Sequence, residues 1–114
     1  MSNVIEEVTV PTLKALRTAV MIFADDVEHG RVPMSKIDMA IWTAADSEEP
    51  CCIGGHLDRR YGWKIGRQSN RENKERYGGQ AFVDLVMPPN YTYTRYTKQD
   101  IVKLCNNFLL ATEC

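Results

Sequence analysis

Apolar residues near the N-terminus recur every three or four positions, and the series consists of Leu13, Leu16, Val20, Phe23 and Val27. This spacing places them on one face of an α-helix. Thr9 or Thr12 is suited to cap the start of this helix, with Pro11 tolerated in its first turn. Gly30 is placed to stop it. The pattern therefore predicts one long amphipathic helix that ends before Gly30.

Three acidic residues, Asp25, Asp26 and Glu28, fall in the last turn of this predicted helix. The C-terminus of a helix carries the negative end of its dipole and favours cations, so the three acids oppose the local field. We consider two interpretations of this mismatch. Either solvent and salt screen it, or the acids form a patch for a basic partner.

The chain from residue 31 to residue 50 is predicted to be a connector with little regular structure. Pro33 and Pro50 bracket it, and Ser35 is suited to cap a short helical turn. Met39 and Trp42, three residues apart, then share a face and are expected to form part of the core wall. Residues 44–49 are predicted to form an exposed acidic loop.

A second helix is predicted from residue 51 to about residue 61, with Gly62 as its stop. Ile53 and Leu57 form an apolar stripe on this helix, and another side carries Cys52, Gly55, His56 and Arg59. The adjacent glycines at positions 54 and 55 allow close approach of another backbone. We therefore expect this segment to seat one helix closely against another.

The chain from Gly62 to Gly79 is polar and basic and has no sustained periodicity. We predict a long loop there, with one helical turn around residues 70–77. A short apolar helix is predicted over residues 79–87, because Pro88-Pro89 must end it. Residues 91–96 alternate as in an edge strand but have no obvious partner, so we predict an extended connector.

A final helix is predicted after Thr97, because Thr97 and Asp100 resemble a capping box in which Asp replaces Glu. Its apolar face contains Ile101, Leu104, Cys105, Phe108 and Leu109. Together the patterns predict an all-α fold with residues 1–114 as a single helical domain. We expect a small bundle of about four helices with a long basic loop and at most a minor strand near 91–96.

The composition agrees with one globular domain. The chain has 114 residues, of which 44% are hydrophobic and 25% charged. No apolar run reaches about 18 residues, so we expect no contact with a membrane. Residues 1–7 carry acids rather than the basic start of a signal peptide, and we expect a cytoplasmic location. Four cysteines form no Cys-x-x-Cys pair, so reduced thiols are expected.

The charges divide unevenly along the chain, although the net charge is only −1. Residues 1–50 hold nine acids against four bases, whereas residues 51–114 hold ten bases against six acids. Within the second part, residues 59–76 hold seven bases against two acids. We therefore expect a molecule with one acidic and one basic side.

Cysteine and histidine chemistry is the first functional hypothesis. Cys52 and His56 are four residues apart and can supply two metal ligands, whereas a structural zinc site uses four. Cys51 lies near a helix start, where the dipole lowers a thiol pKa, and is the best placed candidate nucleophile. No further residues complete a metal site or a catalytic set. We expect these residues to pack rather than react, and we expect neither enzymatic activity nor a cofactor.

Four motifs follow one another between about residues 37 and 110: Ile-Asp-Met-x-x-Trp, Cys-Ile-Gly-Gly-His, a short apolar helix ending at Met-Pro-Pro, and a Thr-capped helix. In this order they resemble a loose, mostly uncharacterised group of small phage and bacterial proteins. The earlier Cys-Gly-Thr of that group is replaced here by Ser47-Glu48-Glu49-Pro50. The resemblance implies a helical domain of phage or mobile-element origin, located in the host-cell cytosol if phage-borne. By analogy it implies a role in blocking a host factor, including a host defence complex.

Cations and aromatic residues interleave from residue 59 onward. This composition suits phosphate contact and base stacking, so a nucleic-acid-binding module that uses residues 59–76 is one hypothesis. The sequence pI near 6.1 is low for such a domain. Tyr, Trp and Arg also dominate protein interfaces, so we favour a non-catalytic module that binds a protein partner, a host factor. Its predicted binding residues are Arg59, Arg60, Trp63, Lys64, Arg67, Arg71, Tyr93 and Arg95.

Overall fold

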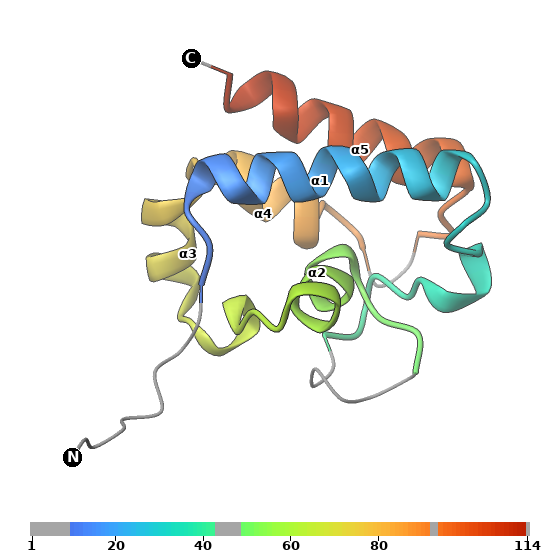
Figure 1. The fold of residues 1–114 in the computed structure, drawn as a ribbon, viewed down its shortest axis with the longest axis horizontal. Helices are drawn as coiled ribbons and strands as arrows, with labels where there is room; N and C mark the ends of the chain where they lie inside the picture. The colour runs from blue at the N-terminus through green and yellow to red at the C-terminus, as the bar shows by residue number, and fades with distance from the viewer. Residues whose placement is uncertain (1–9, 43–48, 92–93, 114) are drawn as a thin grey trace.

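The computed structural model describes residues 10–42, 49–91 and 94–113, which form a helical domain (Figure 1). Within these ranges the α-helices and the short 3-10 helices (η) are α1 (Leu13–Glu28), η1 (Met34–Lys36), α2 (Ile53–Tyr61), η2 (Ile65–Arg67), α3 (Asn70–Arg76), α4 (Gln80–Val86) and α5 (Lys98–Ala111). The all-α prediction is confirmed, and the described ranges contain five α-helices rather than about four.

Strand structure is absent from these ranges apart from one isolated parallel bridge between Ile37 and Cys51. Of the segment predicted to be at most a minor strand, residues 92 and 93 lie outside the described ranges, and the others are not in a strand. None of the helices in the described ranges combines the length and the apolar character that a membrane span requires.

Helices α1 and α5 lie side by side and antiparallel and form the centre of the core (Figure 1). Their facing sides are buried and consist of Leu16, Val20, Phe23 and Val27 on α1 and Ile101, Cys105 and Phe108 on α5. At one end Arg17 donates from Nη2 to the Leu109 carbonyl at 3.0 Å. At the other end Lys98 donates from Nζ to the Glu28 carbonyl at 3.1 Å. These bonds satisfy carbonyl groups near the C-termini of both helices.

The predicted boundaries of both long helices are confirmed. The Thr12 side chain accepts a hydrogen bond from the Ala15 amide at 3.1 Å, and α1 ends just before Gly30, which has φ +76°. Thr97 and Asp100 form a complete capping box at the start of α5. Local side-chain hydrogen bonds therefore set these boundaries.

The connector before α2 differs in detail from the prediction. Pro33, rather than Ser35, occupies the cap position of η1, because its backbone already has the extended conformation that a cap requires. Met39 is buried and Trp42 packs against the core, as expected, but residues 38–42 do not form a helix that both could share. Of the predicted acidic loop, residues 44–48 lie outside the described ranges.

The indole ring of Trp42 lies between two glycines. A Cβ atom on Gly54 would come within 2.5 Å of the ring atoms Cζ2 and Cη2 of Trp42. A Cβ atom on Gly66 would come within 2.6 Å of Trp42 Nε1. For Gly54, the expectation that it seats another helix is therefore wrong. What approaches Gly54 is an aromatic side chain, for which the missing Cβ leaves room.

The long loop predicted from Gly62 to Gly79 is also wrong, because η2 and α3 occupy much of it. The helical turn expected around residues 70–77 is confirmed as α3, which begins with a capping box between Ser69 and Glu72. Asn73 is buried and donates from Nδ2 to the Ile65 carbonyl at 3.2 Å. Tyr77 is fully buried and donates its hydroxyl to the Pro11 carbonyl at 2.8 Å. Buried polar contacts thus fix a segment that hydrophobic periodicity does not mark.

Candidate interaction surface

A groove runs along the N-terminal half of α1 beside the connection from α2 to η2. We call it the aromatic groove, and its lining consists of Thr12, Lys14, Ala15, Thr18, Ala19, Ile22, Tyr61 and Trp63. Its volume is about 460 Å³. The Tyr61 and Trp63 rings stack with their centroids 4.6 Å apart. Ile22 is 43% exposed and Tyr61 39% exposed, so the groove presents apolar surface to solvent.

The end of α2 directs Trp63 toward α1. Gly62 caps the helix with φ +72°, a left-handed conformation that favours glycine. The Trp63 amide then donates to the Asp58 carbonyl at 3.0 Å. This turn folds the chain back on itself directly after Tyr61, which lets the two rings stack.

The Asp58 side chain fixes the backbone that follows Trp63. Asp58 is only 5% exposed, and its carboxylate accepts hydrogen bonds from the Ile65 amide at 2.9 Å and the Gly66 amide at 2.9 Å. It also accepts one from Trp42 Nε1 at 3.1 Å. Burial raises the pKa of Asp58, while these three donors oppose the rise by stabilising the carboxylate. Sequence reasoning missed this residue, since its side-chain partners lie seven to sixteen residues away.

Cations follow Trp63 over residues 64–76, which we call the basic segment. Arg67, Lys74 and Arg76 are exposed, and within the described chain no ion pair reaches them. Arg71 forms an exposed ion pair with Glu75 at 3.4 Å. Glu72 is held in the α3 capping box, and the Ser69 amide lowers the pKa of its carboxyl group. Of the residues predicted to bind a partner, four therefore lie on one continuous stretch of the chain: Trp63, Lys64, Arg67 and Arg71.

Arg59 and Arg60, also predicted to bind a partner, already have contacts within the chain. Arg60 donates from Nη1 to Asp26 Oδ2 at 2.7 Å, and its guanidinium lies 5.6 Å from the centre of the Phe23 ring. Arg59 donates from Nη2 to the Glu49 carbonyl at 3.0 Å. Both arginines therefore help to hold α2 in place.

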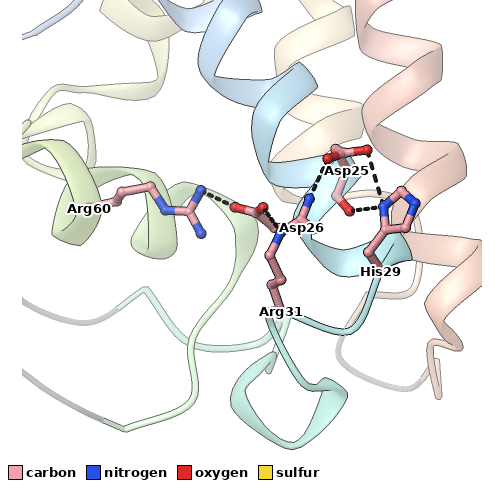
Figure 2. A network of polar contacts seen from close by, with 5 residues as sticks. All are labelled: Asp25, Asp26, His29, Arg31 and Arg60. Atoms are coloured by element: carbon pink, nitrogen blue, oxygen red, sulfur yellow. Dashed lines mark hydrogen bonds and ion pairs between the residues drawn. The ribbon is translucent and has the colours of Figure 1, made fainter.

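The acidic end of α1 belongs to the same set of contacts (Figure 2). Asp25 and Asp26 both pair with Arg31, and Asp26 also pairs with Arg60. These guanidinium groups lower the pKa of Asp26. Neither sequence interpretation of Asp25 and Asp26 includes these ion pairs, in which cations of the same chain compensate the two acids.

Arg95 lies apart from the aromatic groove. It lines a second groove of about 400 Å³ together with Met34, Ser35, Ile37, Asp38, Met39, Ala40, Pro50, Tyr91, Thr94 and Tyr96. The two grooves have no lining residue in common. Tyr93 lies outside the described residues. The structure therefore does not join Arg95 to the surface around Trp63.

The cysteines at the start of α2 are buried and have packing roles. Cys52 caps the helix, with its Sγ accepting from the Gly55 amide at 3.4 Å. Burial raises the pKa of Cys52 to about 11, so its thiol stays protonated at neutral pH. His56 is turned away from it and its Nε2 lies 2.6 Å from the Lys36 carbonyl. Among the described residues, no three metal-binding side chains gather at one place.

Comparison of the chain with protein-family models, with curated proteins and with solved structures found no match. The geometry of the aromatic groove and the basic segment is therefore the basis on which we infer a function.

Proposed function

We propose that the protein is a non-catalytic module that binds a protein partner through the aromatic groove and the adjoining basic segment. The observation that carries the proposal is the stacked Tyr61–Trp63 pair, which lies beside the exposed side chain of Ile22. Exposed apolar patches of this kind mark interaction sites on small proteins. Tyr and Trp are also the residues that contribute most to binding energy at protein interfaces.

The proposal is supported by how firmly the surface is held. Asp58 fixes the backbone of residues 63–66, and Tyr77 ties the far end of the basic segment to Pro11. A surface that is rigid before binding loses less conformational entropy in the complex. Cys51, the best placed candidate nucleophile, is fully buried, and burial raises the pKa of the neighbouring Cys52 thiol, which together argue against the alternative of a cysteine-dependent enzyme.

Site-specific photo-cross-linking in a lysate of the cells that contain the protein tests this function. One variant carries a photo-cross-linking amino acid in place of Ile22, and a matched variant carries it in place of Leu110. Leu110 is 68% exposed on α5 and does not line the aromatic groove. We expect a discrete, protease-sensitive adduct from position 22 that the additional substitution Trp63→Ala removes.

Two results would contradict the proposed function. Adducts of the same size and yield from positions 22 and 110 would mean that the groove is not selective. An adduct from position 22 that is removed by nuclease but not by protease would mean that the protein binds nucleic acid instead of a protein.

Binding of nucleic acid is the second candidate, and the free cations of the basic segment favour it. Arg67, Lys74 and Arg76 are exposed and available for phosphate contacts, and Trp63 precedes Arg67 by four residues. Titration with labelled single- and double-stranded oligonucleotides at two salt concentrations is the direct test. Contact with several phosphates predicts a steep loss of affinity as salt rises. No binding at the lower salt concentration would exclude this candidate.

The finer prediction, a phage-borne protein that blocks a host factor, rests on the motif resemblance over about residues 37–110. Identification of the cross-linked partner tests it, because a host protein whose activity falls when the complex forms is the expected result. A partner encoded beside the protein itself and unaffected by binding would contradict it.

A further inference from the structure

We infer that the aromatic groove binds an acidic amphipathic α-helix of the partner. This inference rests on the proposed protein-binding function and names the chemistry of the partner segment. It requires a wall that another helix can approach, apolar contacts for one face of that helix, and a positive rim for its acidic flanks.

The α1 wall of the groove suits a packed helix. Ala15, Thr18, Ala19 and Ile22 follow the spacing of three, one and three residues that defines one helix face. The first three are small, so the axis of a second helix can come close to α1. The rise per residue makes the wall from Thr12 to Ile22 about 15 Å long, which matches roughly three turns of a partner helix.

The opposite wall supplies the larger apolar contacts. Tyr61 and Trp63 stack on one another and stand across the groove from α1. A Leu or Phe from the partner would bury its side chain between these rings and Ile22. The backbone groups of α1 are hydrogen-bonded within the helix, so the wall offers no strand edge to an extended peptide.

The charge around the groove selects an acidic partner. Among the described residues that line it, Lys14 is the one charged residue and none carries a carboxylate. Lys64 follows Trp63 directly, and Arg67 is exposed one turn later. One turn beyond Ile22, Asp25 and Asp26 are already paired with Arg31. Carboxylates along the partner helix would meet positive potential, whereas lysines there would meet repulsion.

Two further grooves in the described part of the chain do not have this character. The groove along α5 includes Glu28 beside Lys98 and Lys103, and the groove around Tyr91 includes Asp38 beside Arg95. Both therefore mix charges of opposite sign. The combination of apolar walls with purely positive lining is a property of the aromatic groove among these three.

Synthetic helical peptides of about 14 residues test the inference, since that length covers the groove. The first has Leu at positions i, i+3, i+4 and i+7 and Glu on both flanks. A second replaces each Glu with Lys, and a third replaces each Leu with Ser. Fluorescence anisotropy of labelled peptides gives the affinity, and amide chemical shifts of the protein locate the site. We expect the acidic peptide to bind about tenfold more tightly than either relative.

Three single substitutions separate groove binding from general charge attraction. Ile22→Ser and Lys14→Glu change exposed groove residues, and Lys103→Glu reverses an equally exposed lysine on α5. Circular dichroism confirms that each variant is folded before titration. We expect the first two to weaken the acidic peptide about tenfold and Lys103→Glu to leave its affinity unchanged. Lys14→Glu should also improve binding of the lysine peptide.

The possible failures have distinct meanings. Equal binding of the acidic and lysine peptides, shifts confined to residues 67–76, or no binding by a folded protein would each overturn the inference. The proposed function would survive any of these results if the cross-link at position 22 still captured one protein. Loss of both the cross-link and the peptide binding would reject the function itself.

Discussion

Two charged regions of this molecule use their charges in opposite ways. At the end of α1, Asp25 and Asp26 pair with Arg31, and Asp26 also pairs with Arg60 on α2 (Figure 2). In the basic segment, the exposed cations Arg67, Lys74 and Arg76 have no ion pair within the described chain. The acidic region thus holds elements together, whereas the basic segment keeps its charge toward solvent.

A run of charged residues in a sequence therefore does not by itself predict the net charge of the surface on which those residues lie. Residues 59–76 contain seven bases, but Arg60 forms an ion pair with Asp26 and Arg71 forms one with Glu75. Arg59 donates to the Glu49 carbonyl. The positively charged surface therefore begins at Lys64, directly after Trp63, rather than at Arg59. Fewer cations contribute to it than the sequence indicates.

The largest expected effect follows from removing the support of the basic segment. Asp58→Ala deprives the Ile65 and Gly66 amides and the Trp42 indole of their common acceptor. We expect the free energy of unfolding to fall by about 3 kcal/mol, because buried donors lose their partner. Urea denaturation measures it. Asp84→Ala, at an exposed position on α4, is the control, and equal losses in the two variants would contradict this account.

A smaller but still large loss is expected from Gly54→Ala. The new methyl group would overlap the benzene part of the Trp42 ring, which lies between α2 and the start of the basic segment. We expect a loss of about 2 kcal/mol, typical of an overpacked core. In a Trp42→Phe background the same substitution should cost less, since phenylalanine lacks those ring atoms. An unchanged cost in that background would show that Trp42 is not the obstacle.

Removing the ion pairs of the acidic region should lower the free energy of unfolding by a smaller amount, because these ion pairs are partly exposed. Asp26→Asn removes the pairs with Arg31 and Arg60, and we expect a loss of about 1 kcal/mol at neutral pH. The pKa of Asp26 lies below the ordinary value of 3.8, so the unfolded chain binds the proton more readily. This stability is therefore present above pH 3.8 and is lost as pH falls through the folded-state pKa.

The pH dependence of unfolding provides the measurement for that prediction. In urea denaturation, wild type and Asp26→Asn should differ at pH 7, and this difference should shrink as pH falls below 3.8. A difference that persists unchanged at pH 3 would contradict an electrostatic origin.

The smallest effect on stability is expected where the charges are free. Arg67→Ala and Lys74→Ala remove exposed cations that have no ion pair within the described residues. We expect each to change the free energy of unfolding by less than about 0.5 kcal/mol. Thermal denaturation at low and high salt is a sufficient check. A loss above about 1 kcal/mol would mean that the basic segment is structural, and the contrast with the acidic region would disappear.

Much of the fold could be predicted from local signals. The periodic apolar residues of α1 and α5, the caps at Thr12 and Thr97, and the stop at Gly62 each depend on residues within one or two turns. The one helical turn predicted around residues 70–77 is α3, and Ser69 and Glu72 also have the spacing of the capping box that marks its start. The segment has few apolar residues, so hydrophobic periodicity gives no sign of this helix.

The composition of the sequence indicates only part of the candidate site. It predicts Trp63, Lys64, Arg67 and Arg71 as binding residues but not the α1 wall of the groove, since Ala15, Thr18 and Ile22 belong to a distant helix. It also groups Arg95 with them, because aromatic and basic residues surround Arg95 in the sequence. Its position in a second groove depends on packing between residues 34–40 and the chain near Tyr91.

The caps and the apolar faces of the two long helices, α1 and α5, follow from the sequence alone, because hydrogen bonds and side-chain contacts within a helix span only a few residues. Tertiary packing sets which charges are cancelled and which tryptophan lines the aromatic groove. Arg60 meets Asp26 across 34 residues, and Trp42 meets Asp58 across 16. Contacts over such separations depend on how the helices pack, so the pairing of Asp26 and the exposure of the basic segment are consequences of the fold.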